Sequence, residues 1–419
     1  MREVSQEFLD AVLRPYRKWD NGLVIFSRKG AEIYNECEIQ VSEIMSDTNE
    51  LSMGKAFAKE LRAKIYHPKR TIEYVNSLVK VAVGLIVDEE TEDIEEVAIG
   101  NFYIYEATTS DEWETLDIVA YDRMYKLSQV KHTPLDSDYT DTTFLDELAN
   151  EYLIDTPNIT TLGVPITPVD GTVAEQLGWL AGLQGKNAVF KGRLSNSDEL
   201  EFRWYEPVPG YNNRWADFPI TWAEMTDTWG DWVEEGLSTI GRSQQKENGL
   251  TISYKPFTIQ SVTSGTSENV LTVGSGKGIT FENPYMNQTL LNQIANRVIG
   301  ETFVSGSVNT FGNPAYEVGD IVSVQDKDLN AYTMFISNIE WNFSGGCSST
   351  IYSVDSENAT TELTPVQVQT RGLAKNSFPV AENVPQSAEK DFPTVKEFNA
   401  LLTSLKNAGI MRDDEILEK

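Results

Sequence analysis

The chain has 419 residues, a mass of 47.0 kDa and 40% hydrophobic residues, which is enough for two to four structural units with cores of their own. Its 64 acidic residues outnumber its 34 basic residues, for a net charge of −30, and this balance argues against specific binding to a nucleic-acid backbone. No apolar run is long enough for membrane insertion, and the N-terminus lacks the apolar core of a secretion signal, so we expect folding in a cytoplasm.

The acidic residues are spread along the chain and are densest in DEETEDIEE, residues 88–96. One interpretation is a well-solvated surface, because net charge keeps proteins soluble. The other is a negative wall along which DNA passes without sticking. The sequence leaves both interpretations open.

Candidate chemical groups are few. Two cysteines, Cys37 and Cys347, lie too far apart for a CxxC site and are interpreted as small buried hydrophobes. His67 and His132 are too few and too separated for a histidine-based metal site, so each is interpreted as a surface or packing residue. HExxH, GxSxG and phosphate-loop motifs are absent from the sequence, and we predict no catalysis, no cofactor and no metal.

The first β module is expected over residues 1–127. Apolar residues at helical spacing before Pro15 predict a helix, and Asn21-Gly22 and Lys29-Gly30 are hairpin signals. The stretch GNFYIYEATTSDEWETLDIVAYDRMYKL, residues 100–127, reads as two strands around a polar turn, because aromatic and β-branched residues flank TTSDE. Residues 20–127 are therefore predicted to be all β.

Residues 128–187 are predicted to form a helical insert. TTFLDELANEYLI has helical spacing after the cap candidates Asp141 and Thr142, and TVAEQLGWLAGLQG has Thr172 as a cap. Residues 188–247 are predicted to hold a hairpin and a Trp-rich irregular segment. That segment, 204–232, is either a compact core or an aromatic platform for sugars, in which case the stacking residues are Trp215, Trp222 and Trp229.

Residues 248–355 are predicted to form a second β module. It contains a helix at 284–300, a GSGKG turn, and strands that flank a hairpin tip with Asp326 and Asp328. Residues 356–392 read as a linker, and 393–419 as an amphipathic helix that docks on its own chain or on a neighbour. The apolar stripe of this C-terminal docking helix includes Val395, Phe398, Leu402 and Leu405.

Several short motifs, in this order, resemble the hub proteins of phage tail tips and baseplates. They are VAVGLIVD, AIGNFYIYEA and DIVAYDRMYKL early in the chain, and ENPYMNQTLLNQIANRVIG, FGNPAYEVGDIVSVQD and a closing hairpin late in it. The resemblance implies an α+β, mainly β fold with two tube-like β-barrel modules, an α-containing insert and a C-terminal helix. Its architectural residues would shape turns in the two modules: Gly100, Tyr121, Asp122, Gly312, Gly319 and Asp320.

The resemblance also implies a function. Three copies would form a ring that imitates six-fold symmetry, binds the six-fold tail tube or distal tail protein on one face, and holds a three-fold spike or fibre on the other. The lumen would pass DNA and the tape measure protein. We therefore expect a homotrimeric structural protein of the virion tail tip, assembled in the host cytoplasm, with any wall-degrading task left to another protein. The alternative is a carbohydrate-binding tail protein that uses the Trp-rich segment.

Overall fold

The computed structural model describes residues 2, 4–14, 16–28, 30–46, 51–69, 73–88, 91–110, 114–135, 138–192, 198–207, 239–240, 244–253, 256–353 and 362–363. The chain divides into two compact units, Met1–Glu362 and Leu363–Lys419. Of the predicted linker only Glu362–Leu363 are described, and they form a short strand, β27, that the sequence does not predict. The C-terminal helix and the tryptophans Trp215, Trp222 and Trp229 lie outside the described residues. No helix in the described part of the chain is long and apolar enough to cross a membrane.

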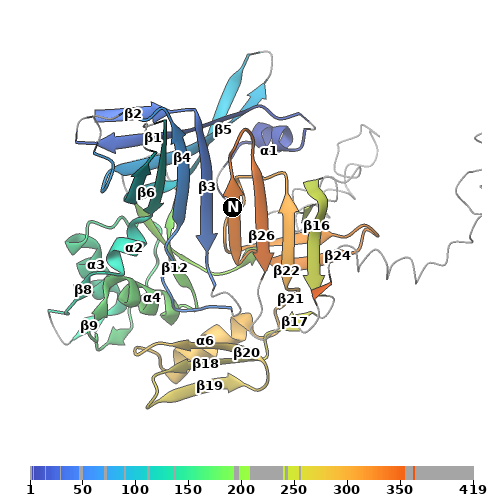
Figure 1. Ribbon diagram of the computed structural model, residues 1–419. Helices are drawn as coiled ribbons and strands as arrows, with labels where there is room; N and C mark the ends of the chain where they lie inside the picture. Colours follow the sequence, from blue (N-terminus) through green and yellow to red (C-terminus); the bar gives the residue numbers. More distant parts are fainter. Residues whose placement is uncertain are drawn as a thin grey trace, which may run out of the picture. The chain divides into compact units, whose positions relative to one another are not determined.

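The fold is mainly β with a smaller helical part, as the sequence predicts. After helix α1 (Gln6–Val12) the chain forms seven strands, which we call the N-terminal strand group (Figure 1). They are β1 (Trp19–Ser27), β2 (Gly30–Tyr34), β3 (Cys37–Ile44), β4 (Glu60–Tyr66), β5 (Leu78–Asp88), β6 (Asp93–Thr109) and β7 (Thr115–Tyr121). In β4, alternation places Leu61, Ala63 and Ile65 on one face, and all three are buried in the core.

The helical insert follows. It contains α2 (Arg123–Leu127), β8 (Lys131–His132), β9 (Tyr139–Thr140), α3 (Asp141–Glu151), β10 (Pro165–Ile166), β11 (Gly171–Thr172) and α4 (Val173–Leu183). Thr172 caps α4 in a reciprocal arrangement with Glu175, as its sequence spacing predicts. The hairpin of β12 (Asn187–Lys191) and β13 (Glu199–Arg203) closes the insert and confirms the predicted pair of strands.

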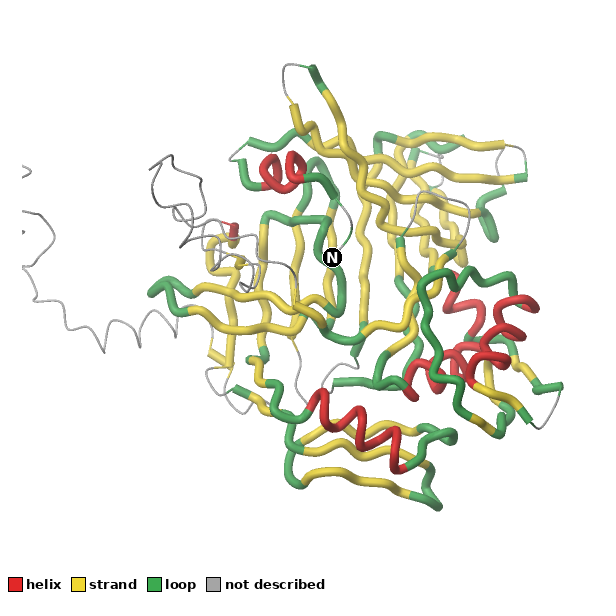
Figure 2. Tube along the Cα trace, turned by 180° about the vertical axis from the view of Figure 1, so that it is seen from behind, coloured by secondary structure: helices red, strands yellow, loops and turns green. Residues whose placement is uncertain are grey.

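The remaining strands form the C-terminal strand group, which begins with β16 (Gln245–Ser253). It continues with β17 (Phe257–Thr258), β18 (Ser261–Gly265), β19 (Val270–Gly274), β20 (Gly278–Glu282), β21 (Thr302–Phe303), β22 (Gly306–Thr310), β23 (Asp320–Gln325), β24 (Ala331–Phe335), β25 (Asn338–Asn342) and β26 (Ser348–Ser353). Helix α6 (Gln288–Val298) packs on β18 and β19, and Figure 2 shows it lying along that small sheet at the bottom of the view. The short strands β14 (Glu206–Pro207) and β15 (Thr239–Ile240) pair with β23, and β27 spans Glu362–Leu363.

One twelve-stranded sheet contains strands from both groups. Its order is β2-β1-β5-β6-β7-β4-β3-β25-β26-β22-β16-β27. The first seven strands come from the N-terminal group, and β25 is the first strand of the C-terminal group to join them (Figure 1). The two groups therefore meet edge to edge through β3 and β25.

Four local predictions are wrong. Asn21-Gly22 lies inside β1, not in a turn, because the alternating core residues Leu23 and Ile25 extend the pairing of β1 with β5. Residues 123–127 form helix α2, so the first module is not all β. Thr140, not Asp141 or Thr142, caps α3, because its hydroxyl and that of Thr143 satisfy each other's backbone N–H. Gly100 lies within β6 beside a register shift, and not at a turn.

Candidate assembly site at the junction of the strand groups

Strands β3 and β25 hold the two strand groups together through backbone pairing. They run antiparallel over five paired positions, one of which places Val41 opposite Trp341. Two further backbone hydrogen bonds extend the contact: Met45 donates to Ser337 over 2.8 Å, and Phe343 donates to Ile39 over 2.8 Å. The contact is thus a continuous ladder of directional bonds rather than a loose packing of side chains.

The core runs without interruption beneath this ladder. Ile39 and Val41 of β3 are buried, and Trp341 and Phe343 on and beyond β25 are fully buried. The rings of Trp341 and Phe343 stack with centroids 6.1 Å apart. Because these large side chains are buried where the two groups meet, separating the groups would expose much apolar surface.

A buried cluster of charged side chains lies at the same junction, and we call it the junction cluster. Its members come from the N-terminal arm, from β3 and the residue before β4, from β13 of the insert, and from the loop and start of β23. They are Arg2, Glu43, Lys59, Arg203, Glu317 and Asp320. Each of these six side chains has at least one partner of opposite charge, as buried charges require.

The cluster begins at Arg2. Its guanidinium pairs with Glu43, and donates to the carbonyls of Pro314 over 2.6 Å and Tyr316 over 2.7 Å. Lys59 Nζ lies 3.3 Å from the same Glu43 oxygen, Oε1. The side chains of Arg2 and Glu43 are only 4% and 1% exposed, so this pairing is almost fully withdrawn from water.

Arg203 completes the cluster from the side of the insert. Its Nη1 lies 3.0 Å from Glu317 Oε2, and its Nη2 lies 2.7 Å from Asp320 Oδ1. Asp320 also accepts the backbone N–H of Glu317 over 2.8 Å, which fixes the turn between them. A single guanidinium therefore ties the helical insert to the C-terminal strand group.

Electrostatics in the cluster follow from burial and charge partners. Burial alone would raise the pKa of Glu317, but the attraction of Arg203 and Arg2 outweighs it and holds that pKa far below its usual range. For Asp320, burial dominates and raises the pKa despite the nearby Arg203. Burial alone would lower the pKa of Arg203, and the carboxylates of Glu317 and Asp320 raise it instead. The arrangement stabilises fixed charges and offers no free nucleophile or base.

The outer face of the same strands is polar. An open hollow of about 430 Å³ lies over β25, β3, β4 and β7. The hollow is lined by charges of both signs, including Glu38, Arg62, Lys64 and Asp117. The junction thus buries its apolar and paired charged groups on one side and presents mixed charge on the other.

The structure brings the predicted architectural residues of the C-terminal group to the junction. Asp320 belongs to the cluster, and Gly319 has φ +91°, where a Cβ would lie 2.6 Å from Arg203 Nε. Glycine is required there for two reasons: residues with a side chain rarely adopt this backbone conformation, and Arg203 leaves no room for a Cβ. Gly312, at φ +79°, packs against Cys347 Sγ, further from the cluster.

The predicted architectural residues of the N-terminal group are not members of the junction cluster. Asp122 caps α2 by accepting the N–H of Met124 over 3.0 Å, and its own N–H donates to the Lys59 carbonyl over 3.0 Å. Burial raises the pKa of Asp122 to about 7. Tyr121 ends β7 and stacks on Tyr125 with centroids 4.3 Å apart.

The remaining candidates are placed as follows. Cys347 is buried, as predicted, whereas Cys37 is only half-buried. His67 is exposed, and His132 is buried within the insert.

Trp204, the one described tryptophan of the 204–232 segment, is 3% exposed and cannot stack on a sugar. The carbohydrate platform otherwise lies outside the described residues and stays a prediction.

Sequence reasoning missed five members of the cluster, which are Arg2, Glu43, Lys59, Arg203 and Glu317. Glu317 carried a usable signal, because it lies three residues before Asp320 in GNPAYEVGD, between apolar neighbours. Arg203 lies in the apolar run LEFRWY, where a charge needs a partner. Glu43 follows Ile39 and Val41 at alternate positions, which places it on their face of a strand. Arg2 and Lys59 carry no such signal.

Comparison with known proteins gives matches only among solved structures, because neither a family model nor a curated protein matches the sequence. A tail protein from Neisseria meningitidis MC58 matches with 11% identity over 81% of this chain and 97% of its own, at a TM-score of 0.46. The 43 kDa tail protein of prophage MuSo2 from Shewanella oneidensis matches with 15% identity, 81% and 99% coverage, and a TM-score of 0.48. The prophage tail protein gp18 from Listeria monocytogenes EGD-e matches with 9% identity, 85% and 100% coverage, and a TM-score of 0.46.

The chain is similar in structure to phage tail and baseplate proteins. The function of this chain has to be inferred from its own residues.

Proposed function

We propose that this chain is the structural hub of a phage tail tip or baseplate. Three copies form a ring that joins a six-fold tail tube to a three-fold spike or fibre. The observation that carries the proposal is the pairing of β3 with β25, which makes the two strand groups one continuous sheet. In this role each strand group acts as one tube-like barrel module, so that three chains present six similar units.

Such a ring needs a fixed angle between the two units of each chain. If the units moved independently, the six positions would not match a rigid tube. A backbone ladder resists bending and sliding, and a buried ion cluster permits few alternative dockings because each displaced charge would lose its partner. Both features are present at the junction.

The motifs behind the family resemblance support the same proposal. GNPAYEVGD supplies Glu317 and Asp320, and the carbonyls of Pro314 and Tyr316 that hold Arg2. AYD supplies Asp122, whose N–H binds the Lys59 carbonyl. Glu317 and Asp320, which look like turn residues in the sequence, are therefore junction residues in the fold.

The proposed partners follow from the ring. The tail-tube or distal tail protein binds one face, the spike, fibre or other tip protein binds the opposite face, and DNA and the tape measure protein pass through the lumen. The net charge of −30 supports this role, because an acidic wall does not retain DNA. The protein would be assembled in the host cytoplasm and would act in the virion without chemistry of its own.

Contact between copies is proposed at the end of the large sheet. Strand β2 is its terminal strand, and Ile33 on β2 is 70% exposed. An exposed sheet edge with an apolar side chain is a template for pairing with another chain. We place a subunit contact there, on the edge away from β1.

The test is the mass of the purified chain by native mass spectrometry. The proposal predicts three times 47.0 kDa. Ile33→Lys should shift the population towards monomers, because an edge lysine opposes strand pairing. Lys64→Glu, in the hollow on the sheet's outer face, is the control and should leave the mass unchanged. A particle of one, two or six chains would contradict the trimer.

A further inference from the structure

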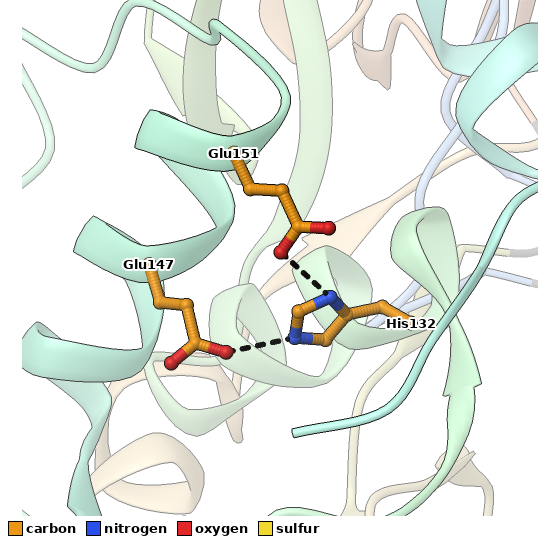
Figure 3. Close-up of side chains that lie close together, drawn as sticks. All are labelled: His132, Glu147 and Glu151. Carbon is orange, nitrogen blue, oxygen red and sulfur yellow. Dashed lines mark hydrogen bonds and ion pairs between the residues drawn. The ribbon is translucent and has the colours of Figure 1, made fainter. Parts of the chain in front are cut away.

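His132 and two glutamates of α3 lie together in the helical insert (Figure 3). His132 Nε2 is 3.1 Å from Glu147 Oε1, and His132 Nδ1 is 3.4 Å from Glu151 Oε2. Glu147 and Glu151 are one helical turn apart, so both carboxylates leave the same face of α3 and point at the ring. One donor atom from each of the three residues lies within 4.8 Å of the others.

The surrounding fold fixes the imidazole in this position. His132 ends β8, which pairs with β11, and Gln176 of α4 donates to the His132 carbonyl over 3.2 Å. The ring lies against Phe144, with centroids 5.9 Å apart, and its side chain is only 2% exposed. The glutamates are more accessible, at 16% for Glu147 and 49% for Glu151, which leaves an entry path from solvent.

The charge balance of the group is negative. Two carboxylates face one imidazole, so the sum is −2 with a neutral ring and −1 with a charged ring. Among the described residues, no lysine or arginine forms an ion pair with Glu147 or Glu151. The Glu147 carboxylate is only 16% exposed and contacts the buried ring, so water solvates its charge incompletely and a cation there would be favoured. A divalent cation with a neutral imidazole would bring the sum to zero.

We propose that His132, Glu147 and Glu151 bind a divalent transition metal ion, with Zn²⁺ as the best match. Imidazole nitrogen and carboxylate oxygen are both Zn²⁺ ligands, and three protein ligands plus a water complete a tetrahedral site. Bonds of about 2.0–2.2 Å place tetrahedral donors about 3.3–3.6 Å apart. The 3.1 Å between His132 Nε2 and Glu147 Oε1 is close to that spacing.

The ring's other nitrogen has a partner ready. With the metal on Nε2, the Glu151 carboxylate moves from Nδ1 to the metal, which its half-exposed side chain permits. Tyr152 Oη, 3.2 Å from Nδ1, then accepts the Nδ1–H and fixes the tautomer, as metal-bound histidines require. The Tyr139 hydroxyl donates to Glu147 and orients that carboxylate. The metal would act as a structural clip between β8 and α3.

The test uses the full chain, stripped with a chelator and titrated with Zn²⁺ against a chromophoric competitor. We expect one Zn²⁺ per chain, and a loss in affinity of at least about tenfold in His132→Ala, Glu147→Gln and Glu151→Gln. The chain has only two histidines, so His67→Ala is a matched control that should bind as the parent does. Asp146→Asn, an exposed neighbour on α3, is the second control.

Co²⁺ in place of Zn²⁺ gives a readout beyond affinity, because a tetrahedral site should produce visible absorption that Glu151→Gln weakens. Glu151 is half-exposed, so this variant keeps the test valid even if His132→Ala fails to fold. Absence of one-to-one binding, or binding unchanged by Glu151→Gln, would overturn the site and leave the cluster as an ion pair between a charged ring and two carboxylates. The proposal is independent of the hub function.

Discussion

Removing the Arg203 guanidinium is the sharpest perturbation of the junction. In Arg203→Met the side chain keeps most of its apolar stem, but Glu317 and Asp320 lose a cation at 3.0 Å and 2.7 Å. The carboxylates are 4% and 2% exposed, so water cannot replace the lost partner. Breaking a buried pair in this way costs about 3–5 kcal/mol. The free energy of unfolding should fall by that amount.

Arg62→Met is the matched control, because Arg62 also pairs with a carboxylate, Glu60, over 2.5 Å. There the guanidinium is 64% exposed, and water replaces the partner. Urea unfolding of both variants and the parent, followed by tryptophan fluorescence and circular dichroism, gives the two midpoints. The Arg62 variant should unfold at the parent's midpoint. If Arg203→Met unfolded there too, the junction cluster would not be a structural tie.

Adding Glu317→Gln to Arg203→Met separates two contributions to this loss. The single variant deprives two buried carboxylates of the Arg203 cation, so part of its cost is uncompensated charge. Neutralising Glu317 in the same chain should therefore recover some stability. If the double variant instead lost the sum of the two single losses in unfolding free energy, Glu317 would depend on Arg2 rather than on Arg203.

Three further predictions concern the same region. Burial raises the pKa of Asp122 to about 7, against about 3.9 when unfolded. The folded chain thus holds a proton that the unfolded chain has lost, and stability falls as pH rises from about 4 to 7. Asp122→Asn, which can still cap α2, should flatten this slope in unfolding midpoints, and an unchanged slope would refute the assignment. Gly319→Ala should lower the melting temperature more than Gly345→Ala does. Both glycines have positive φ, so alanine costs about 1–2 kcal/mol of backbone strain at either position. Only at Gly319 would the added methyl group also collide with Arg203. Trp341→Ala should cost about 3–5 kcal/mol by urea unfolding, and a loss below 1 kcal/mol would contradict its place in the core.

Local features of the fold could be read from the sequence. The cap of α4 follows from Thr172 and Glu175 at capping-box spacing, and the inward face of β4 follows from alternation. Asn21-Gly22 shows where local reading fails. The dipeptide favours a turn, but the pairing of β1 with β5 through Leu23 and its neighbours decides the backbone.

The junction could not be predicted, because its parts are distant in sequence. Val41 and Trp341 are 300 positions apart, and neither strand has a sequence pattern that identifies the strand it pairs with. Arg2 looks like an ordinary surface charge until the fold buries it. His132 was discounted because histidines are few, although carboxylates on a neighbouring helix supply the other donors.

The symmetry-matching role is tested most directly by stoichiometry. The full chain is mixed with the tail-tube protein of the same phage, and the complex is weighed by native mass spectrometry and imaged by electron cryomicroscopy. The hub proposal predicts three copies of this chain against each ring of six tube subunits, with both strand groups of every copy touching the tube. Six copies per tube ring, or contact through only one strand group, would contradict it.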